Sequence, residues 1–214
     1  MRLTAATLTA ITAASLIAAS ASAQSQGQSH DHAAMGHAAH GQAGTQAAAM
    51  DHSAMIPRAT PGQTGQASII NGQGAEIGKA TLTQGATGLL IKVEATGLTP
   101  GWHGIHIHAT GQCAAPFTSA GAHINHTDPK TPHGLLNAQG PDDGDLPNLY
   151  AAADGSAKAE FFTTKARISQ DGPGQWLWDA DGSALVIHAN PDDHNSQPIG
   201  GAGDRVACAV LSAQ

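Results

Sequence analysis

The sequence predicts an all-β protein, a sandwich or barrel of short strands. Glycine and proline are abundant, with 26 Gly and 11 Pro in 214 residues, as is typical of chains with many turns. Turn signals at Asn71-Gly72 and Asp154-Gly155 separate short β-prone runs. No part of the region that contains these runs has the apolar period of an amphipathic helix. A helical bundle or coiled coil is therefore excluded.

Seven or eight strands follow from the apolar and β-branched runs. We expect them at residues 67–71, 76–83, 89–95, 103–108, 150–153, 157–162, 184–188 and 205–211. Two connections are too long to be plain turns, at residues 111–148 and 189–204. Because long loops on a rigid sheet commonly carry functional residues, we expect the site there.

The first 23 residues are typical of a secretory signal. Arg2 is their only charged residue, an apolar stretch follows at residues 8–19, and Ala21-Ser22-Ala23 suits a signal peptidase. The stretch is too short and too rich in Ala and Thr to favour a membrane anchor. We therefore expect cleavage after residue 23 and a mature protein in the periplasm or secreted, with no membrane attachment.

Residues 24–62 form a predicted disordered tail ahead of a domain at residues 63–214. The tail lacks Val, Leu, Phe, Trp and Tyr, so it cannot bury a core. Its candidate metal ligands are His30, His32, His37, His40, His52, Met35, Met50 and Met55. Thioether sulfur favours Cu(I) and imidazole suits copper and zinc. We interpret the tail as a copper-scavenging segment, against the alternative of a solvated linker.

The net charge of the chain narrows the classes of binding partner that we expect. The formal net charge is −7, and the nine Lys and Arg residues form no basic cluster, so nucleic acid is not expected as a partner. The 13 histidines are the outlier in the composition and point to a metal function instead. The two cysteines of an exported chain favour a disulfide over two buried free thiols.

The central motif is HGIHIH at residues 103–108. Alternate residues of a strand share a face, so His106 and His108 project together, opposite Ile105 and Ile107. Two imidazoles so placed can chelate one metal ion. His103 has the parity of the isoleucines, so we expect a structural or supporting role for it.

Further candidate ligands lie in the long loops or at a strand end: His123, His133, Asp142, Asp143, Asp145 and His188. Any one of these histidines alone is most simply a surface or loop residue. As a set, in a chain with only 12% charged residues, they favour a metal site.

These segments resemble the copper/zinc superoxide dismutase family in its secreted bacterial form. The matching pieces are HGIHIHATGQC, SAGAHIN, GDLPNL, ALVIHANPDD and IGGAGDRVACAV, in the family's order, over residues 67–211. The resemblance implies an eight-stranded Greek-key β-sandwich or flattened barrel with two long functional loops. It also implies that copper and zinc are the cofactors.

The resemblance assigns roles residue by residue. The implied copper ligands are His106, His108, His188 and His123, and His123 also bridges to zinc. His133 and Asp145 match further zinc ligands, and Asp192 matches a carboxylate that links a copper ligand to a zinc ligand. Arg205 matches the guanidinium beside the copper, and with His123 it forms the implied catalytic pair. Cys113 and Cys208 match the family disulfide.

One position departs from the family pattern. The family usually has a third zinc histidine three residues before the zinc aspartate, where this chain has Asp142. Because a carboxylate can bind zinc through oxygen, Asp142 is the candidate fourth ligand. The alternatives are His126, an unassigned imidazole nearby, and a water molecule.

The implied activity is dismutation of superoxide anion to dioxygen and hydrogen peroxide by copper redox cycling. The competing function is copper binding or delivery in the periplasm on the same fold, which the tail and the altered zinc site favour. The full copper set and Arg205 favour the enzyme. The family contains monomers and homodimers, and the sequence leaves that choice open.

Overall fold

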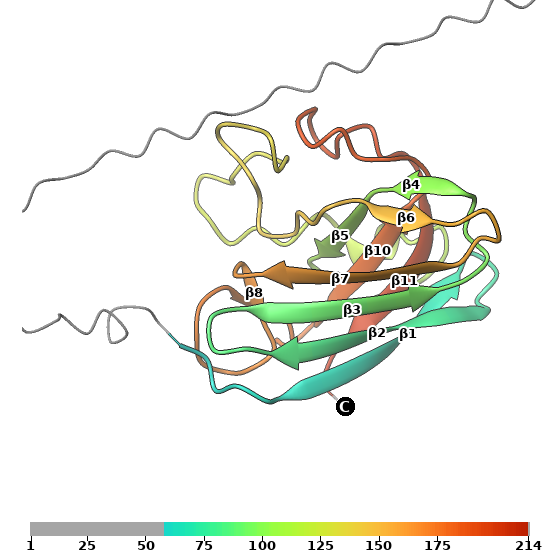
Figure 1. Cartoon of the computed structure of the whole chain (residues 1–214). Coiled ribbons are helices and arrows are strands. Elements are labelled where there is room, and N and C mark those ends of the chain that lie inside the picture. Colours follow the sequence, from blue (N-terminus) through green and yellow to red (C-terminus); the bar gives the residue numbers. More distant parts are fainter. Residues whose placement is uncertain (1–57, 214) are drawn as a thin grey trace, which may run out of the picture. The chain divides into compact units, whose positions relative to one another are not determined.

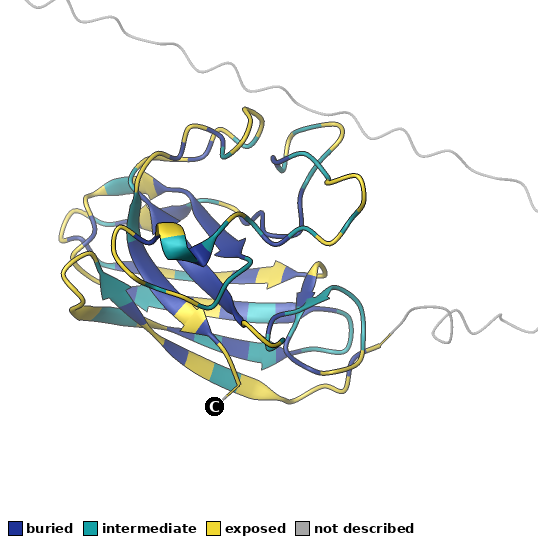
Figure 2. Cartoon of the chain, turned by 180° about the vertical axis from the view of Figure 1, so that it is seen from behind, coloured by how far each residue is buried: buried dark blue, intermediate teal, exposed yellow. Residues whose placement is uncertain are grey.

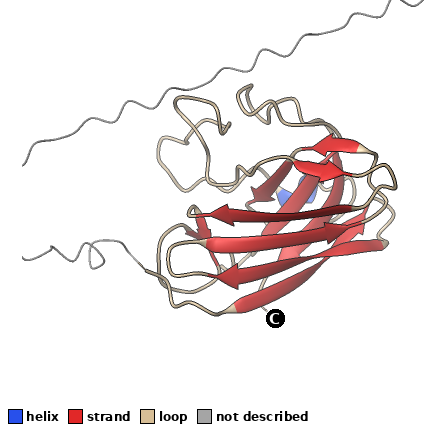
Figure 3. Ribbon diagram, in the orientation of Figure 1, coloured by secondary structure: helices blue, strands red, loops and turns tan. Residues whose placement is uncertain are grey.

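The computed structural model describes residues 58–213 as a β domain (Figures 1 and 3). The predicted signal peptide and most of the predicted tail lie outside the described residues. The strands are β1 Thr64–Asn71, β2 Glu76–Gln84, β3 Leu89–Ala95, β4 Gly101–His103, β5 Ile105–His108, β6 Leu149–Ala151, β7 Ala157–Thr163, β8 Ala166–Arg167, β9 Gln175–Trp176, β10 Ser183–His188 and β11 Arg205–Leu211. A short 3₁₀ helix, η2 Thr118–Ala120, lies between β5 and β6. None of the described residues form a helix with the length and hydropathy that a membrane span requires.

Nine strands form one antiparallel sheet in the order β4-β6-β7-β3-β2-β1-β11-β10-β5. The two edge strands, β4 and β5, are separated in sequence by Gly104 alone. The edges must therefore lie next to each other, so the sheet curls into a nearly closed barrel. The predicted all-β class is confirmed.

The strand count differs from the predicted eight. The single strand expected at residues 103–108 divides at Gly104, because His103 pairs with Leu149 of β6 whereas Ile105 pairs with Ile187 of β10. A separate two-stranded sheet, β8 and β9, also forms in the connection between β7 and β10. Neither the break nor this short pair has a clear apolar pattern in the sequence.

The barrel interior is filled by alternate residues of the strands, shown dark blue in Figure 2. In β3 the buried positions are Leu89, Ile91, Val93 and Ala95. In β5 both faces are buried, with Ile105 and Ile107 in the core and the two histidines on the other side. The predicted alternation of β5 is thus present, and the loops 111–148 and 189–204 supply the groups around its histidine face.

The ordered contacts begin before the predicted domain boundary at residue 63. Ala59 is buried, and its backbone N–H donates to Ala86 O at 2.9 Å. Thr60 Oγ1 donates to Asp171 Oδ2 at 3.1 Å. Ala59 fits because Gly172, with φ +106°, has no side chain on the facing surface. The last residues of the predicted tail therefore pack on the domain.

Gly104 offers a test of the barrel closure. Its N–H donates to Asn190 O and its carbonyl accepts from His188 N, each at 2.8 Å. An added Cβ would lie 2.8 Å from Ala202 Cβ and 3.4 Å from Asp192 Cβ. We predict that Gly104→Ala lowers the free energy of unfolding by about 1–3 kcal/mol through overpacking.

The measurement is denaturant unfolding of the wild type and the variant. Gly72→Ala is the control, because a Cβ there would meet nothing within 4 Å. Equal losses of stability in the two variants would contradict the close approach at Gly104.

Candidate metal centre

Three imidazoles converge from neighbouring strands. His106 and His108 lie on β5, and His188 ends β10, which is paired with β5 in antiparallel register. All three side chains are buried, and one nitrogen of each lies within 4.8 Å of the others. The sheet therefore supplies the three predicted copper ligands from one face without any loop.

A fourth imidazole enters from the loop at residues 111–148. His123 forms an isolated antiparallel bridge with His108, and its ring centroid lies 4.2 Å from that of His106 and 5.0 Å from that of His108. His123 therefore lies directly beside two of the three grouped imidazoles.

Each of the four rings is held by a hydrogen bond on one nitrogen only. The fixed nitrogens are His106 Nε2 to Asp192 Oδ2 at 2.8 Å, His108 Nδ1 to Gly121 O at 2.9 Å, His188 Nδ1 to Gly203 O at 3.0 Å and His123 Nδ1 to Asp142 Oδ2 at 2.9 Å. The second nitrogen of each ring, Nδ1 in His106 and Nε2 in the others, is buried without a hydrogen-bond partner. The three grouped imidazoles of His106, His108 and His188, with His123 beside them, fit a copper ion.

Burial keeps three of these rings neutral. Desolvation lowers the pKa of His106 and of His188 to about 4, and that of His108 to about 2. A metal binds the neutral imidazole, so these ligands release no proton on binding near neutral pH.

A second group of donors lies beyond His123 and contains His133, Asp142 and Asp145. His133 Nδ1 lies 2.5 Å from Asp145 Oδ1, and His123 Nδ1 lies 2.9 Å from Asp142 Oδ2 and 3.6 Å from Asp145 Oδ1. Two imidazoles and two carboxylates form a donor set that zinc accepts.

The carboxylates change the titration of the rings that face them. Burial by itself lowers the pKa of His133, but hydrogen bonds to Asp145 and Asp192 outweigh it and raise the pKa to about 10. The pKa of His123 is also raised, by Asp142 and Asp145 against desolvation. In Asp145 the histidine hydrogen bonds outweigh burial and hold the pKa well below its usual range. The carboxylates of the second group therefore favour a positive charge on the two rings that face them.

Asp192 joins the two groups. Its Oδ2 accepts from His106 Nε2 at 2.8 Å, and its Oδ1 accepts from His133 Nε2 at 3.1 Å. Asp192 is buried, so both contacts are shielded from bulk solvent. Asp192 thus lies where the sequence predicted, between a ring of the first group and a ring of the second.

The structure separates the two side-chain alternatives for the fourth zinc ligand. Asp142 is buried within the donor group. The side chain of His126 is 55% exposed, and its Nδ1 pairs with Asp143 Oδ2 at 2.6 Å. The geometry therefore favours Asp142 over His126. His103 is buried outside both groups, with Nδ1 2.7 Å from His188 O, which agrees with a structural role.

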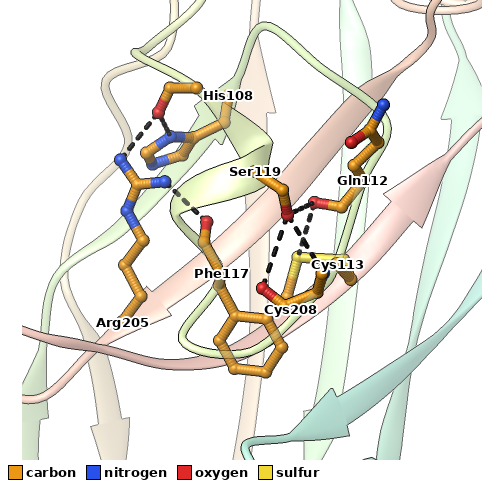
Figure 4. The surroundings of a disulfide bond; sticks show 9 residues. His108, Gln112, Cys113, Phe117, Ser119, Arg205 and Cys208 are labelled. Atoms are coloured by element: carbon orange, nitrogen blue, oxygen red, sulfur yellow. Dashed lines mark hydrogen bonds between the residues drawn. A yellow bond between two sulfur atoms is a disulfide. The ribbon is translucent and has the colours of Figure 1, made fainter.

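Arg205 lies beside the first group, as predicted (Figure 4). Its Nη1 donates to Phe117 O at 2.7 Å and its Nη2 to Gly121 O at 2.6 Å. Gly121 O also accepts from His108 Nδ1, so one carbonyl positions both side chains. Arg205, His108 and His123 line a cleft of about 930 Å³.

A disulfide attaches residues 113–121, the loop segment whose carbonyls accept from Arg205, to the sheet. The predicted bond between Cys113 and Cys208 is present and links the first long loop to β11 (Figure 4). The side chain of Phe117, which belongs to this segment, packs in a small apolar cluster with Cys208 and Val186. The carbonyls that orient Arg205 are therefore fixed by covalent attachment and by packing.

Two residues of the site were not found from the sequence. Asn148 and His194 hydrogen-bond Asp192 from the two long loops. Asn148 carries no ligand-like signal, and His194 lies only two residues after Asp192 in a segment without periodicity. Their roles depend on how the loops meet.

The fold and these donor groups define a β-barrel protein with two adjoining metal sites that share one histidine. Residues 76–211 match the family described as copper/zinc superoxide dismutase (SODC), and the chain belongs to this family.

Relatives and solved structures agree with this assignment. Superoxide dismutase [Cu-Zn] of Caulobacter vibrioides is 54% identical over 141 residues, covering 65% of this chain and 80% of the relative. The crystal structure of a SOD-like protein from Bacillus subtilis shares the fold, with a TM-score of 0.65 and 33% identity over 70% of this chain and 99% of that one. The solved structure of Cu/Zn superoxide dismutase from Brucella abortus also shares it, with a TM-score of 0.57 and 27% identity over 70% of this chain and 100% of that one.

We predict that Asp142 contributes to zinc affinity. Asp142→Ala should weaken zinc binding by about 10-fold or more, because it removes a donor from the site. Asp142→His should restore or strengthen binding, because an imidazole then joins the other two. The measurement is a competitive zinc titration of the three proteins.

Asp128→Ala is the control for loss of one carboxylate in the same loop, since Asp128 belongs to neither donor group. Identical zinc affinities for the wild type and both Asp142 variants would mean that Asp142 does not bind zinc.

Proposed function

We propose that this protein is a superoxide dismutase that converts two superoxide anions and two protons into dioxygen and hydrogen peroxide. The observation that carries this function is the set of four buried, unpartnered imidazole nitrogens with a fixed guanidinium beside them. The membership in the copper/zinc family and the 54% identity to a named superoxide dismutase support it.

When bound, copper supplies a one-electron redox couple that both oxidises and reduces superoxide, and zinc supplies a fixed positive charge on His123. His106, His108, His188 and His123 would hold copper through their unpartnered nitrogens. His123, His133, Asp142 and Asp145 would hold zinc.

The residues of this chain supply binding and proton handling. Two carbonyl hydrogen bonds fix the Arg205 guanidinium at the cleft, where its charge and remaining N–H groups can bind an anion. His123 lines the same cleft, and its Nε2, which is buried without a hydrogen-bond partner, is the atom that would hold a proton for the leaving peroxide.

The overall charge opposes a negatively charged substrate, since the formal net charge is −7. Attraction of superoxide must therefore be local. Lys130 and Arg205 both line the cleft and supply the positive field at its mouth.

The function is tested by superoxide consumption of the purified protein, with copper and zinc content measured on the same sample. We expect rapid consumption that depends on copper. A protein that binds copper in full and consumes no superoxide would support copper delivery instead.

We predict that Arg205→Glu lowers kcat/KM for superoxide by at least about tenfold at low ionic strength, with copper content unchanged, because an anion-binding group is replaced by a repelling one. Lys158→Glu makes the same change of charge on the far surface of β7, where the side chain is 78% exposed, and should have little effect. Equal kcat/KM for the two variants would exclude this role for Arg205.

For the N-terminal segment we propose export through residues 1–23 to the periplasm or outside the cell. We further propose that the histidines and methionines of residues 24–57 help to load copper. Removal of 24–57 should spare the activity of copper-loaded enzyme but slow copper uptake when copper is scarce, because soft thioether and imidazole donors are lost. Equal loading rates of the full-length and shortened proteins at limiting copper would contradict the second proposal.

A further inference from the structure

His194 makes the shortest contact to the carboxylate that joins the two donor groups. Its backbone N–H donates to Asp192 Oδ1 at 2.6 Å, against 2.8 Å and 3.1 Å for the contacts of His106 and His133. Its ring nitrogen Nδ1 lies 3.5 Å from Asp192 Oδ2, which is an electrostatic contact, and this nitrogen is buried without a hydrogen-bond partner. Both oxygens of Asp192 therefore face His194 as well as a predicted metal ligand.

The amide of Asn148 determines which nitrogen of the neutral His194 ring carries the proton. Asn148 Oδ1 accepts from Asp192 N at 2.9 Å, which establishes which end of the amide is oxygen. Its Nδ2 then has two hydrogens, and the partners are Asp192 O at 2.8 Å and His194 Nε2 at 3.2 Å. Because His194 Nε2 accepts a hydrogen bond, the proton of the neutral ring is on Nδ1, which faces Asp192 Oδ2.

The backbone of His194 holds this arrangement between the two long loops. Its φ is 61°, a left-handed value that few residues other than glycine adopt. Its carbonyl accepts from Leu136 N at 2.9 Å. Gly134 makes this approach possible, because a Cβ there would lie 2.4 Å from His194 O. His194 is thus fixed from the first loop as well as from its own.

We propose that His194 is a positioning residue that holds the Asp192 carboxylate in line with both His106 and His133, through the hydrogen bond of its backbone N–H and through the dipole of its ring, whose Nδ1 faces Asp192 Oδ2. The proposal rests on the metal centre proposed above. Since hydrogen-bond partners of metal ligands set ligand orientation and basicity, the His194 ring should affect both metals without touching either.

Two nearly isosteric substitutions separate positioning from simple packing. Both Asn and Asp tolerate a left-handed backbone, so they place the same strain on the chain. The amide of His194→Asn can direct an N–H toward Asp192 Oδ2, as the ring does, whereas the carboxylate of His194→Asp has no N–H and repels Asp192. We expect His194→Asp to weaken zinc binding by about 10–100-fold and to shift the visible absorption band of the copper-loaded protein. We expect His194→Asn to keep both properties close to those of the wild type.

Asn195→Asp is the control for added charge, because it introduces a carboxylate at the next, exposed position of the same loop. We expect it to leave zinc affinity and the copper spectrum unchanged. Circular dichroism and thermal melting of the metal-free proteins establish that each variant is folded.

His194→Gly keeps the proposal testable if the aspartate variant does not fold. Glycine keeps the backbone N–H and relieves the left-handed conformation, so a purely structural role predicts unchanged or tighter metal binding. We expect weaker zinc binding, because the ring and its dipole are lost.

The proposal is overturned if His194→Asn, His194→Asp and His194→Gly bind zinc with the wild-type affinity and share its copper spectrum. A wild-type protein that binds neither copper nor zinc would instead overturn the metal centre itself, so the two failures are distinguishable.

Discussion

Each of the four imidazole rings at the metal centre has one nitrogen held by a hydrogen bond and the other buried without a partner, and three of the rings lie within ligand distance of one another. The partners are two backbone carbonyls, from Gly121 and Gly203, and two carboxylates, from Asp142 and Asp192. A buried imidazole nitrogen without a partner costs free energy, so four of them together are not expected in a core that serves stability alone. The rest of the site is arranged around the groups that supply these hydrogen bonds.

The barrel provides the rigid half of this arrangement. Strand β5 buries both of its faces, with isoleucines in the core and histidines in the site, so the strand cannot shift the side chains of His106 and His108 without disturbing the core. The loops provide the other half. Cys113–Cys208 anchors one loop to β11, and Asp192 with its partners Asn148 and His194 joins the second loop to the first.

The sequence allowed prediction of the parts that have local patterns. The period of two in residues 105–108, the turn at Asn71-Gly72 and the lengths of the two loops were sufficient for the fold class and for the face that carries His106 and His108. The break of the strand at Gly104 could not be predicted, since it depends on pairing with two strands that are distant in sequence.

The choice between Asp142 and His126 also depended on tertiary structure, because both lie in a loop where spacing does not determine direction. Asn148 and His194 were beyond sequence reasoning for the same reason. Their effect arises from a chain of hydrogen bonds between two loops, and no single residue in it has a distinctive pattern.

The most direct test of the account is anomalous diffraction from crystals loaded with copper and zinc, recorded at the absorption edge of each metal. The account predicts copper among His106 Nδ1 and the Nε2 atoms of His108, His123 and His188, with zinc among His123, His133, Asp142 and Asp145. Copper bound away from the four unpartnered nitrogens, or zinc at His126 in place of Asp142, would contradict it.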